Sequence, residues 1–210
     1  MFGMSMWITG ENCVAGNYWQ SPLTDAILSF EKRYSGRRQA SFHTTLSNIF
    51  KVEIMLRKKV SDSLTEQVYI VRSQHINGYG RLFGGILMQW IDELAGIVTR
   101  RHCGTTVTTA AIDNLRFEAP AFQDDMVVLI GRLTYVGTTS MEVRIDVYVE
   151  DPDGIRRTIN RAYVVMVAIS EEGKPLPVPG LIIESENERY EWQSGEKRYR
   201  LRKMRREEGF

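Results

Sequence analysis

Asp92 is the residue whose setting most suggests chemistry. It lies at the border of the apolar face of a segment, Gly84–His102, whose apolar residues recur with helical spacing. Its neighbours three and four positions away on such a helix are Met88, Gln89, Ala95 and Gly96. None of them is a cation, and a half-buried carboxylate without a partner is costly. Asp92 must therefore bond to a distant donor, hold a proton or serve a site, and its spacing leaves these alternatives open.

A glycine-rich loop, residues 77–85 (NGYGRLFGG), directly precedes that segment. Asn77 could present a carboxamide to a substrate, but an asparagine in such a loop serves equally well as a turn residue with a positive φ. His75 also lies in a predicted loop, where a histidine is more often exposed to solvent than catalytic. Gly84 and Gly85 would let backbone approach backbone and would leave the first N–H groups of a helix accessible.

A helix and several strands must position these groups. On the predicted helix Gly84–His102, the polar residues Gln89, Glu93 and Arg100 lie opposite a broad apolar face. That face consists of Leu87, Met88, Trp90, Ile91, Leu94, Ala95 and Val98. Because the face is so broad, we expect the helix to pack against a sheet along much of its length.

Alternation of apolar and polar residues indicates the strands of that sheet. The predicted strands are Gln67–Arg72, Thr105–Glu118, Asp125–Val136, Ser140–Glu150 and Ile155–Ile169. Asp151-Pro152-Asp153-Gly154 is typical of a hairpin turn. One strand, one helix and four strands with short links predict an α+β fold, in which a long helix packs on an antiparallel sheet.

Composition divides the chain into three stretches. We interpret residues 1–55 as an N-terminal extension, with a short amphipathic helix after Ser21-Pro22. Residues 56–180 form the predicted functional domain, which ends in a proline-rich stretch that cannot continue a strand. Residues 181–210 form a charged, helical tail. Its basic run, Lys197–Arg206, could touch RNA or an anionic membrane, but the flanking glutamates favour a solvated helix face.

Composition also excludes several classes of protein. The chain has 210 residues, 25% of them charged, and a formal net charge of +1, which argues against a nucleic-acid partner. The two cysteines, Cys13 and Cys103, are too few for a disulfide scaffold and lack metal-ligand spacing. No apolar run is long enough to cross a membrane, and the first residues lack the pattern of a secretory signal. We therefore expect a cytoplasmic protein without integral membrane association.

Several motifs, in a consistent order, resemble the hotdog-fold acyl-CoA thioesterases. The first is Asn77-x-x-Gly80-x-x-Phe83-Gly84-Gly85, followed by Asp92 on the helix. Further segments that match in register are Val107–Phe117 before Pro120, Gly137–Val143, Ala162–Ile169 and Glu172–Pro179. The resemblance covers residues 64–180 and leaves the chain's beginning and end unmatched.

The resemblance implies a hotdog fold, in which a curved antiparallel sheet of about five strands wraps a long central helix. It also implies a homodimer formed edge to edge, with the active site between subunits. Dimers of this kind often assemble further into trimers of dimers. Edge-to-edge pairing would also remove an exposed sheet edge.

The implied activity is hydrolysis of fatty acyl-CoA to free acid and CoA. Asp92 would act as general base on water, or, as the less favoured route, as a nucleophile that forms an anhydride. Asn77 would orient the water or the carbonyl. Backbone N–H groups at the helix start, those of Gly84, Gly85 and Ile86, would polarise the thioester oxygen.

The resemblance also implies where CoA binds. Thr139 and Ser140 match positions that line its pantetheine or nucleotide arm. Its phosphates need cations, for which Arg156, Arg157, Arg161 and Lys174 are candidates. No metal is implied, and no cofactor other than the CoA that forms part of the substrate.

Two other functions fit a hotdog fold. A dehydratase would place a histidine at the position of Asn77, and an amide cannot take a proton from carbon. A non-catalytic acyl-CoA-sensing module would have no need of Asp92, and a transcriptional sensor would carry a helix-turn-helix, for which residues 20–52 offer only one helix.

Overall fold

The structure is a computed structural model that describes residues 57–209. The predicted N-terminal extension, including its helix, lies outside the described residues. In chain order the elements are β1 (Arg57–Lys59), η1 (Val60–Asp62), β2 (Thr65–Ile70), η2 (Ser73–His75), α3 (Gly84–Cys103), β3 (Thr106–Phe117), β4 (Met126–Val136), β5 (Ser140–Glu150), β6 (Arg156–Ile169), β7 (Gly180–Ile182) and α4 (Glu186–Glu208). Every predicted strand is present, and its ends lie within two residues of the predicted ones. The same holds for the predicted helix Gly84–His102, which is α3.

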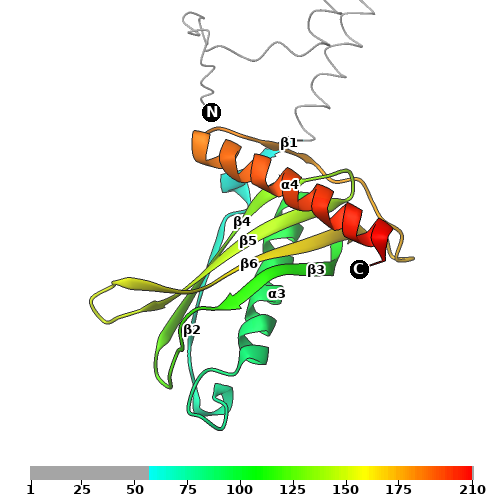
Figure 1. Cartoon of the computed structure of the whole chain (residues 1–210). Helices are drawn as coiled ribbons and strands as arrows, with labels where there is room; N and C mark the ends of the chain where they lie inside the picture. Colours follow the sequence, from blue (N-terminus) through cyan, green and yellow to red (C-terminus); the bar gives the residue numbers. More distant parts are fainter. Residues whose placement is uncertain (1–56, 210) are drawn as a thin grey trace, which may run out of the picture. The chain divides into compact units, whose positions relative to one another are not determined.

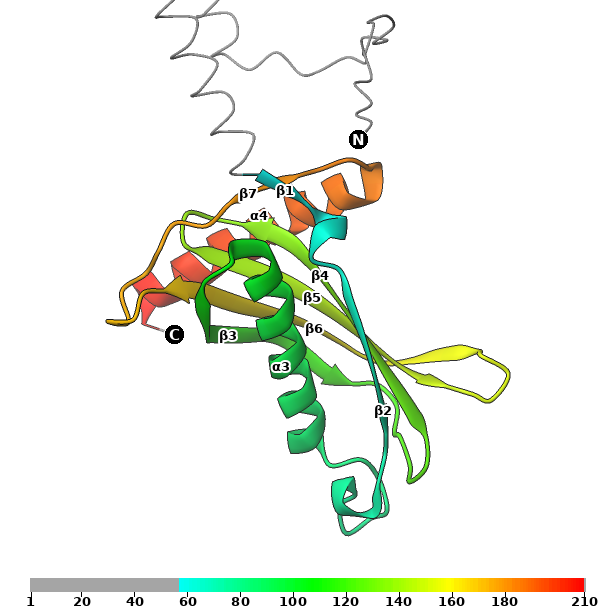
Figure 2. The ribbon, with the colours of Figure 1, turned by 180° about the vertical axis from the view of Figure 1, so that it is seen from behind.

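Five of the strands form one antiparallel sheet in the order β2-β4-β5-β6-β3. Helix α3 lies on one face of this sheet and α4 crosses the other, as opposite views show (Figures 1 and 2). The buried face of α3 packs on inward-facing side chains of the central strands, among them Leu129, Val143 and Val164. The predicted α+β hotdog architecture is therefore confirmed.

A second, two-stranded sheet joins the start of the described chain to the segment before α4, because β1 pairs in parallel with β7. Beside it, the fully buried His102 at the end of α3 lies with Nε2 2.8 Å from the Pro179 carbonyl oxygen. Its Nδ1 is buried and has no hydrogen-bond partner among the residues that the structure describes. Burial lowers the pKa of His102, more than the bond to Pro179 raises it.

This buried histidine predicts a loss of stability in acid. Below pH ~6.5 the unfolded chain protonates this side chain, while the folded chain keeps it neutral until a lower pH. The free energy of unfolding should therefore fall as the pH drops below ~6.5. Urea titrations at several pH values should show a shallower fall for His102→Gln, which retains a donor for Pro179 but does not titrate. Equal slopes for the two proteins would contradict this assignment.

The C-terminal segment is helical and most of its basic run is exposed, as predicted, but two of its arginines do not belong to that solvated face. Arg198 and Arg202 on α4 reach the sheet and bind Glu142 on β5, whose side chain is 1% exposed. Arg198 also lies over the ring of Tyr163, 3.7 Å from its centre. Buried carboxylates on the sheet explain the difference, because they supply counter-charges that the sequence could not place.

A glycine lets α4 come this close to the sheet. A Cβ atom on Gly195 would lie 2.6 Å from Tyr135 Cβ and 3.0 Å from Glu142 Oε1. Two aromatic rings of α4 pack against Tyr135, Trp192 at 4.7 Å and Tyr199 at 5.5 Å between centroids. Gly195 therefore lies where the helix backbone packs closely on the sheet.

Gly195→Ala is expected to destabilise the fold, although alanine is the better helix former. Overpacking of this kind costs about 1–3 kcal/mol, which outweighs a gain in helix propensity of about 1 kcal/mol. Thermal unfolding should show a lower melting temperature for Gly195→Ala. Gln193→Ala, an exposed change on the same helix, should leave the melting temperature nearly unchanged. A stabilised Gly195→Ala protein would show that the helix is not seated this closely.

Candidate active site

Asp92 lies half-buried on the flank of α3 nearest the edge strand β3. The Thr109 hydroxyl, on β3, donates a hydrogen bond to Asp92 Oδ1 over 2.5 Å. The same hydroxyl oxygen lies 3.4 Å from the sulfur of Met166 on β6. The distant donor for Asp92 is thus a neutral hydroxyl rather than a cation. Such a donor orients the carboxylate and leaves it able to accept a proton.

Thr109 is the site residue that the sequence did not single out. It is one of several threonines in the predicted strand Thr105–Glu118, and simple alternation could not choose among them. The register of β3 with β6 shifts between Thr109 and Ala111, so one extra residue breaks the alternation there. The interval from Asp92 to Thr109 in a family motif would have been the only usable signal.

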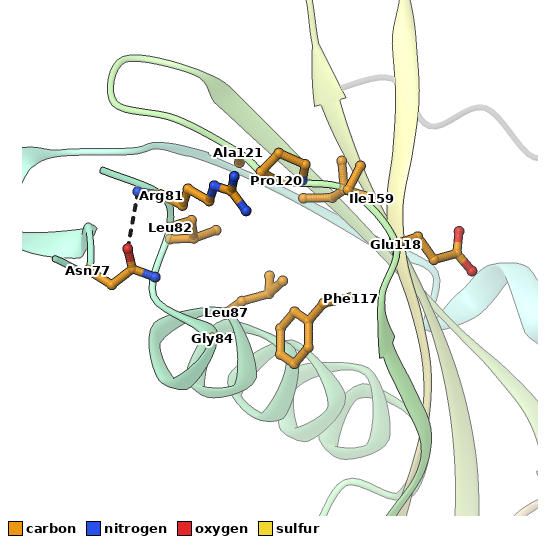
Figure 3. Close-up of a pocket in the computed structure, with 11 residues that line it drawn as sticks. Asn77, Arg81, Leu82, Gly84, Leu87, Phe117, Glu118, Pro120, Ala121 and Ile159 are labelled. Atoms are coloured by element: carbon orange, nitrogen blue, oxygen red, sulfur yellow. Dashed lines mark hydrogen bonds between the residues drawn. The ribbon is translucent and has the colours of Figure 1, made fainter. Parts of the chain in front are cut away.

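Asn77 serves the loop as well as the site. Its Oδ1 accepts hydrogen bonds from the backbone N–H groups of Tyr79 at 2.9 Å and Arg81 at 3.3 Å. Asn77 therefore stabilises the turn, as one alternative predicted, but it does so with its side chain. The residue with a positive φ is Gly80, at 71°. With its oxygen used in this way, the carboxamide has its NH₂ donors left for a ligand. Figure 3 shows the amide nitrogen on the side of the pocket.

His75 has a structural role. Its Nδ1 accepts a hydrogen bond from the backbone N–H of Arg72 at 3.1 Å, and its ring meets Trp90 edge-on at 5.2 Å. Trp90 in turn stacks on Tyr69 of β2 at 4.3 Å. These contacts hold the loop before α3 against β2.

A pocket of about 370 Å³ opens at the N-terminus of α3 (Figure 3). Asn77 and Arg81 line one side, and apolar side chains such as Leu87, Phe117 and Ile159 line the other. A pocket with an apolar wall and few polar groups suits a molecule with an apolar portion and a polar reacting group.

The two glycines at the start of α3 were predicted to let another backbone segment approach. They instead make room for aromatic rings. A Cβ atom on Gly84 would lie 3.0 Å from the Phe117 ring, and one on Gly85 would lie 2.6 Å from the Phe83 ring. The Ile86 N–H donates to the Phe83 carbonyl at 3.0 Å. Of the three predicted oxyanion donors, Ile86 is thus already bonded, which leaves Gly84 and Gly85.

Asn77 and Asp92 of one chain lie apart. The lining of the pocket includes Asn77 and Gly84 but not Asp92. Asp92 lies eight positions after Gly84 on α3, a rise of about 12 Å. One chain therefore offers two half-sites: a carboxamide with helix N–H groups, and a carboxylate with a hydroxyl.

Comparisons with known proteins show which family the chain resembles. A family model described as the thioesterase superfamily matches residues 79–155. The cytosolic acyl coenzyme A thioester hydrolase of Rattus norvegicus is 31% identical over 84% of this chain, which spans 48% of that protein. An acyl-CoA hydrolase from Staphylococcus aureus, solved with butyryl coenzyme A and coenzyme A, has a TM-score of 0.69 and 33% identity, over 73% of this chain and 94% of its own.

The chain belongs to the thioesterase superfamily.

Other structures of the Staphylococcus aureus enzyme carry an alanine in place of an aspartate, a threonine or an asparagine. A hexameric acyl-CoA thioesterase has a TM-score of 0.68 and 34% identity, over 71% of this chain and 96% of its own. The chain spans about half the length of the rat relative.

In this thioesterase-superfamily chain the predicted CoA-binding residues lie in separate places. Thr139 and Ser140 precede and begin β5, and Lys174 follows β6 at the same end of the sheet, since Ser140 pairs with Val167. Arg156 and Arg157 lie at the other end of these strands, beside the hairpin turn. The first group lies at the end of the sheet near Thr109, whose cross-strand partner is Met166, and the second lies nearer the pocket.

The three predicted arginines already have carboxylate partners. Arg156 binds Glu66 at 2.9 Å and Glu150 at 2.6 Å, and both bonds raise its pKa. Arg157 binds Asp151 at 3.1 Å.

Arg161 binds the buried Asp146 at 2.6 Å. Burial would raise the pKa of Asp146, but hydrogen bonds from Arg144 and Arg161 lower it below its usual value. A role in CoA binding stays a prediction for all three arginines and for Lys174.

Within residues 57–209, no cluster of three or more potential metal ligands occurs. In the same part of the chain, no helix is long and apolar enough to cross a membrane.

Proposed function

We propose that this chain is an acyl-CoA thioester hydrolase, with Asp92 as its general base. One observation carries the proposal: the Asp92 carboxylate has no cationic partner in the described part of the chain and is held by the hydroxyl of Thr109. The asparagine, aspartate and threonine replaced in the Staphylococcus aureus enzyme are separated by the same intervals as Asn77, Asp92 and Thr109. A shared pattern of three residue types at two intervals is much more specific than any one of them.

The proposed reaction begins with a water bonded to Asp92. The carboxylate takes a proton as the water oxygen attacks the thioester carbonyl carbon. The carbonyl oxygen becomes an oxyanion, which Asn77 Nδ2 and the N–H groups of Gly84 and Gly85 stabilise by hydrogen bonds. Collapse of the tetrahedral intermediate breaks the C–S bond, and the leaving CoA thiolate takes up the proton held by Asp92, which regenerates the carboxylate. In the less favoured route, Asp92 itself attacks and water hydrolyses the resulting anhydride.

The proposed site is completed by a second copy of the chain. A water must lie within about 3 Å of both the base and the carbonyl, whereas Asp92 lies about 12 Å along α3 from Gly84, which lines the pocket together with Asn77. Strand β3 is an edge strand with Thr109 on it, so a second copy paired along this edge can bring its own Asn77 to Asp92. We accordingly propose a homodimer, and a trimer of dimers as the assembly of six.

Thr139 and Ser140, which lie at the end of the sheet near Thr109, are proposed to contact the CoA arm. The cations proposed for its phosphates are Arg156, Arg157, Arg161 and Lys174. The cytosolic location in the name of the rat relative supports a cytoplasmic protein.

The proposal is tested with a panel of acyl-CoA substrates of increasing chain length and detection of the released thiol. The full chain should release CoA from at least one substrate at a rate proportional to enzyme concentration. Binding of acyl-CoA without any thiol release would instead indicate a sensing module. If the chain neither bound acyl-CoA nor released thiol, both the hydrolase and the sensing function would be rejected.

A further inference from the structure

The edge strand β3 has an irregular course between two residues of the proposed site. Its register with β6 shifts between Thr109 and Ala111 and again between Asp113 and Arg116. Thr109 before the first shift bonds to Asp92, and Phe117 after the second lines the pocket at Gly84. Because β3 has a neighbouring strand on one side only within residues 57–209, its ladder alone restrains these bulges weakly.

The C-terminal helix holds this strand between the two bulges. Arg202 on α4 binds Asp113 Oδ2 at 2.7 Å and Glu142 Oε2 at 2.8 Å through the same nitrogen, Nη1. The side chains of Arg202 and Asp113 are 13% and 15% exposed, so solvent screens this contact less than a surface pair. Arg202 thus ties the irregular edge strand to a central strand of the sheet.

The central end of this tie is itself firmly fixed. Glu142 accepts hydrogen bonds from Arg198 Nη2 at 2.8 Å and from the Thr134 hydroxyl at 2.8 Å. Gly195 brings the axis of α4 close to the same carboxylate. Loss of Arg202 would therefore leave Glu142 bonded and α4 seated, while Asp113 would lose its partner.

We propose that Arg202 of α4 is a positioning residue for thioester hydrolysis: through Asp113 it sets the course of β3 and thereby places the Thr109 hydroxyl on Asp92. This inference rests on the proposed function. It gives the C-terminal helix, which lies on the face of the sheet opposite α3, a part in organising the site (Figure 1).

The expected effect is on turnover rather than on substrate binding. A carboxylate misplaced by about 1 Å can cost up to a hundredfold in rate. Arg202→Gln should therefore lower kcat at least about tenfold and change KM less than about threefold, because Thr109 touches the base and not the bulk of the substrate. Arg202→Lys, which keeps the charge, should recover part of the loss.

The matched control is Arg200→Gln, measured in the full chain. Arg200 binds Glu196 on the exposed side of the same helix, and its side chain is 71% exposed. This substitution should leave kcat and KM unchanged. Equal effects of the two substitutions, or dissociation of Arg202→Gln into monomers by light scattering, would overturn the proposal. Asp113→Asn is a second variant, which keeps Arg202 on Glu142 and should reproduce the loss of kcat.

The route through Thr109 is tested in a Thr109→Val background. If Arg202 acts by placing the Thr109 hydroxyl, Arg202→Gln should lower kcat less than about twofold once that hydroxyl is gone. The same fold-loss in both backgrounds would overturn the proposal.

Hydrogen exchange provides a readout that needs no substrate. The β3 amides should exchange faster in Arg202→Gln than in Arg200→Gln, and unchanged exchange would overturn the proposed restraint. If the wild-type chain hydrolysed no acyl-CoA, the proposed function would fail, whereas this exchange result would still decide whether Arg202 restrains β3.

Discussion

Asp92→Asn should remove nearly all thioesterase turnover, by at least about a thousandfold in kcat. Asparagine has the shape of aspartate and can still accept a hydrogen bond from Thr109, but it cannot take a proton from water. CoA affinity and melting temperature should therefore stay close to those of the wild type. Thiol release at saturating acyl-CoA measures the turnover, and calorimetric titration with CoA measures the affinity for CoA.

Glu93→Gln is the matched control for this substitution. Glu93 is the next residue on α3, is exposed, and accepts a hydrogen bond from Gln89 at 2.8 Å. The same loss of a carboxylate there should leave kcat unchanged. An Asp92→Asn protein that kept full activity would end the assignment of Asp92 as the base.

Asn77→Ala has the second-largest expected effect, a loss of two or more orders of magnitude in kcat. The carboxamide is proposed to stabilise the oxyanion, and removal of one such donor costs about 10²–10³ in rate. Alanine also removes the oxygen that accepts from Tyr79 and Arg81, so part of the loss could come from the loop.

Asn77→Asp separates these two contributions. Aspartate keeps an oxygen for the loop N–H groups but lacks the NH₂ donors, so its kcat should fall about as far as that of Asn77→Ala. A loss of less than twofold in either variant would remove Asn77 from the mechanism. Near-normal activity confined to Asn77→Asp would leave Asn77 as a loop residue only.

The main sheet and its helix could be predicted because their patterns are local. In β5, an apolar residue stands at every second position from Met141 to Val149, and the predicted bounds Ser140–Glu150 are those observed. The turn that follows closes with the Asp151 N–H bonded to the Ile155 carbonyl at 2.9 Å, and Gly154 takes a φ of 78°. Turn chemistry and alternation act within a few residues, so a single sequence carries them in full.

The features that the sequence missed depend on contacts between distant segments. The pairing of β1 with β7 joins short segments of no clear periodicity. Arg198 and Arg202 read as surface charges until the sheet places Glu142 and Asp113 beneath them. Thr109 reaches Asp92 across 17 residues, at a bulge that shifts the alternation of its strand.

In the candidate site, too, the sequence predicted only those features that depend on local patterns. Asp92 stood out because its helical neighbours include no cation, which is a local property. The dual use of Asn77, and the bond that occupies the Ile86 N–H, depend on the folded loop and could not be derived from residue types.

The most direct test of a site shared between two copies is activity after mixing two inactive variants. Full-length Asn77→Ala and Asp92→Asn proteins would be combined under conditions in which subunits exchange, and thiol release from acyl-CoA would be measured. Random mixing should restore about a quarter of wild-type turnover, because about half of the dimers are mixed and each has one intact site. No recovery in a sample with proven subunit exchange would contradict a site built from Asn77 of one copy and Asp92 of the other.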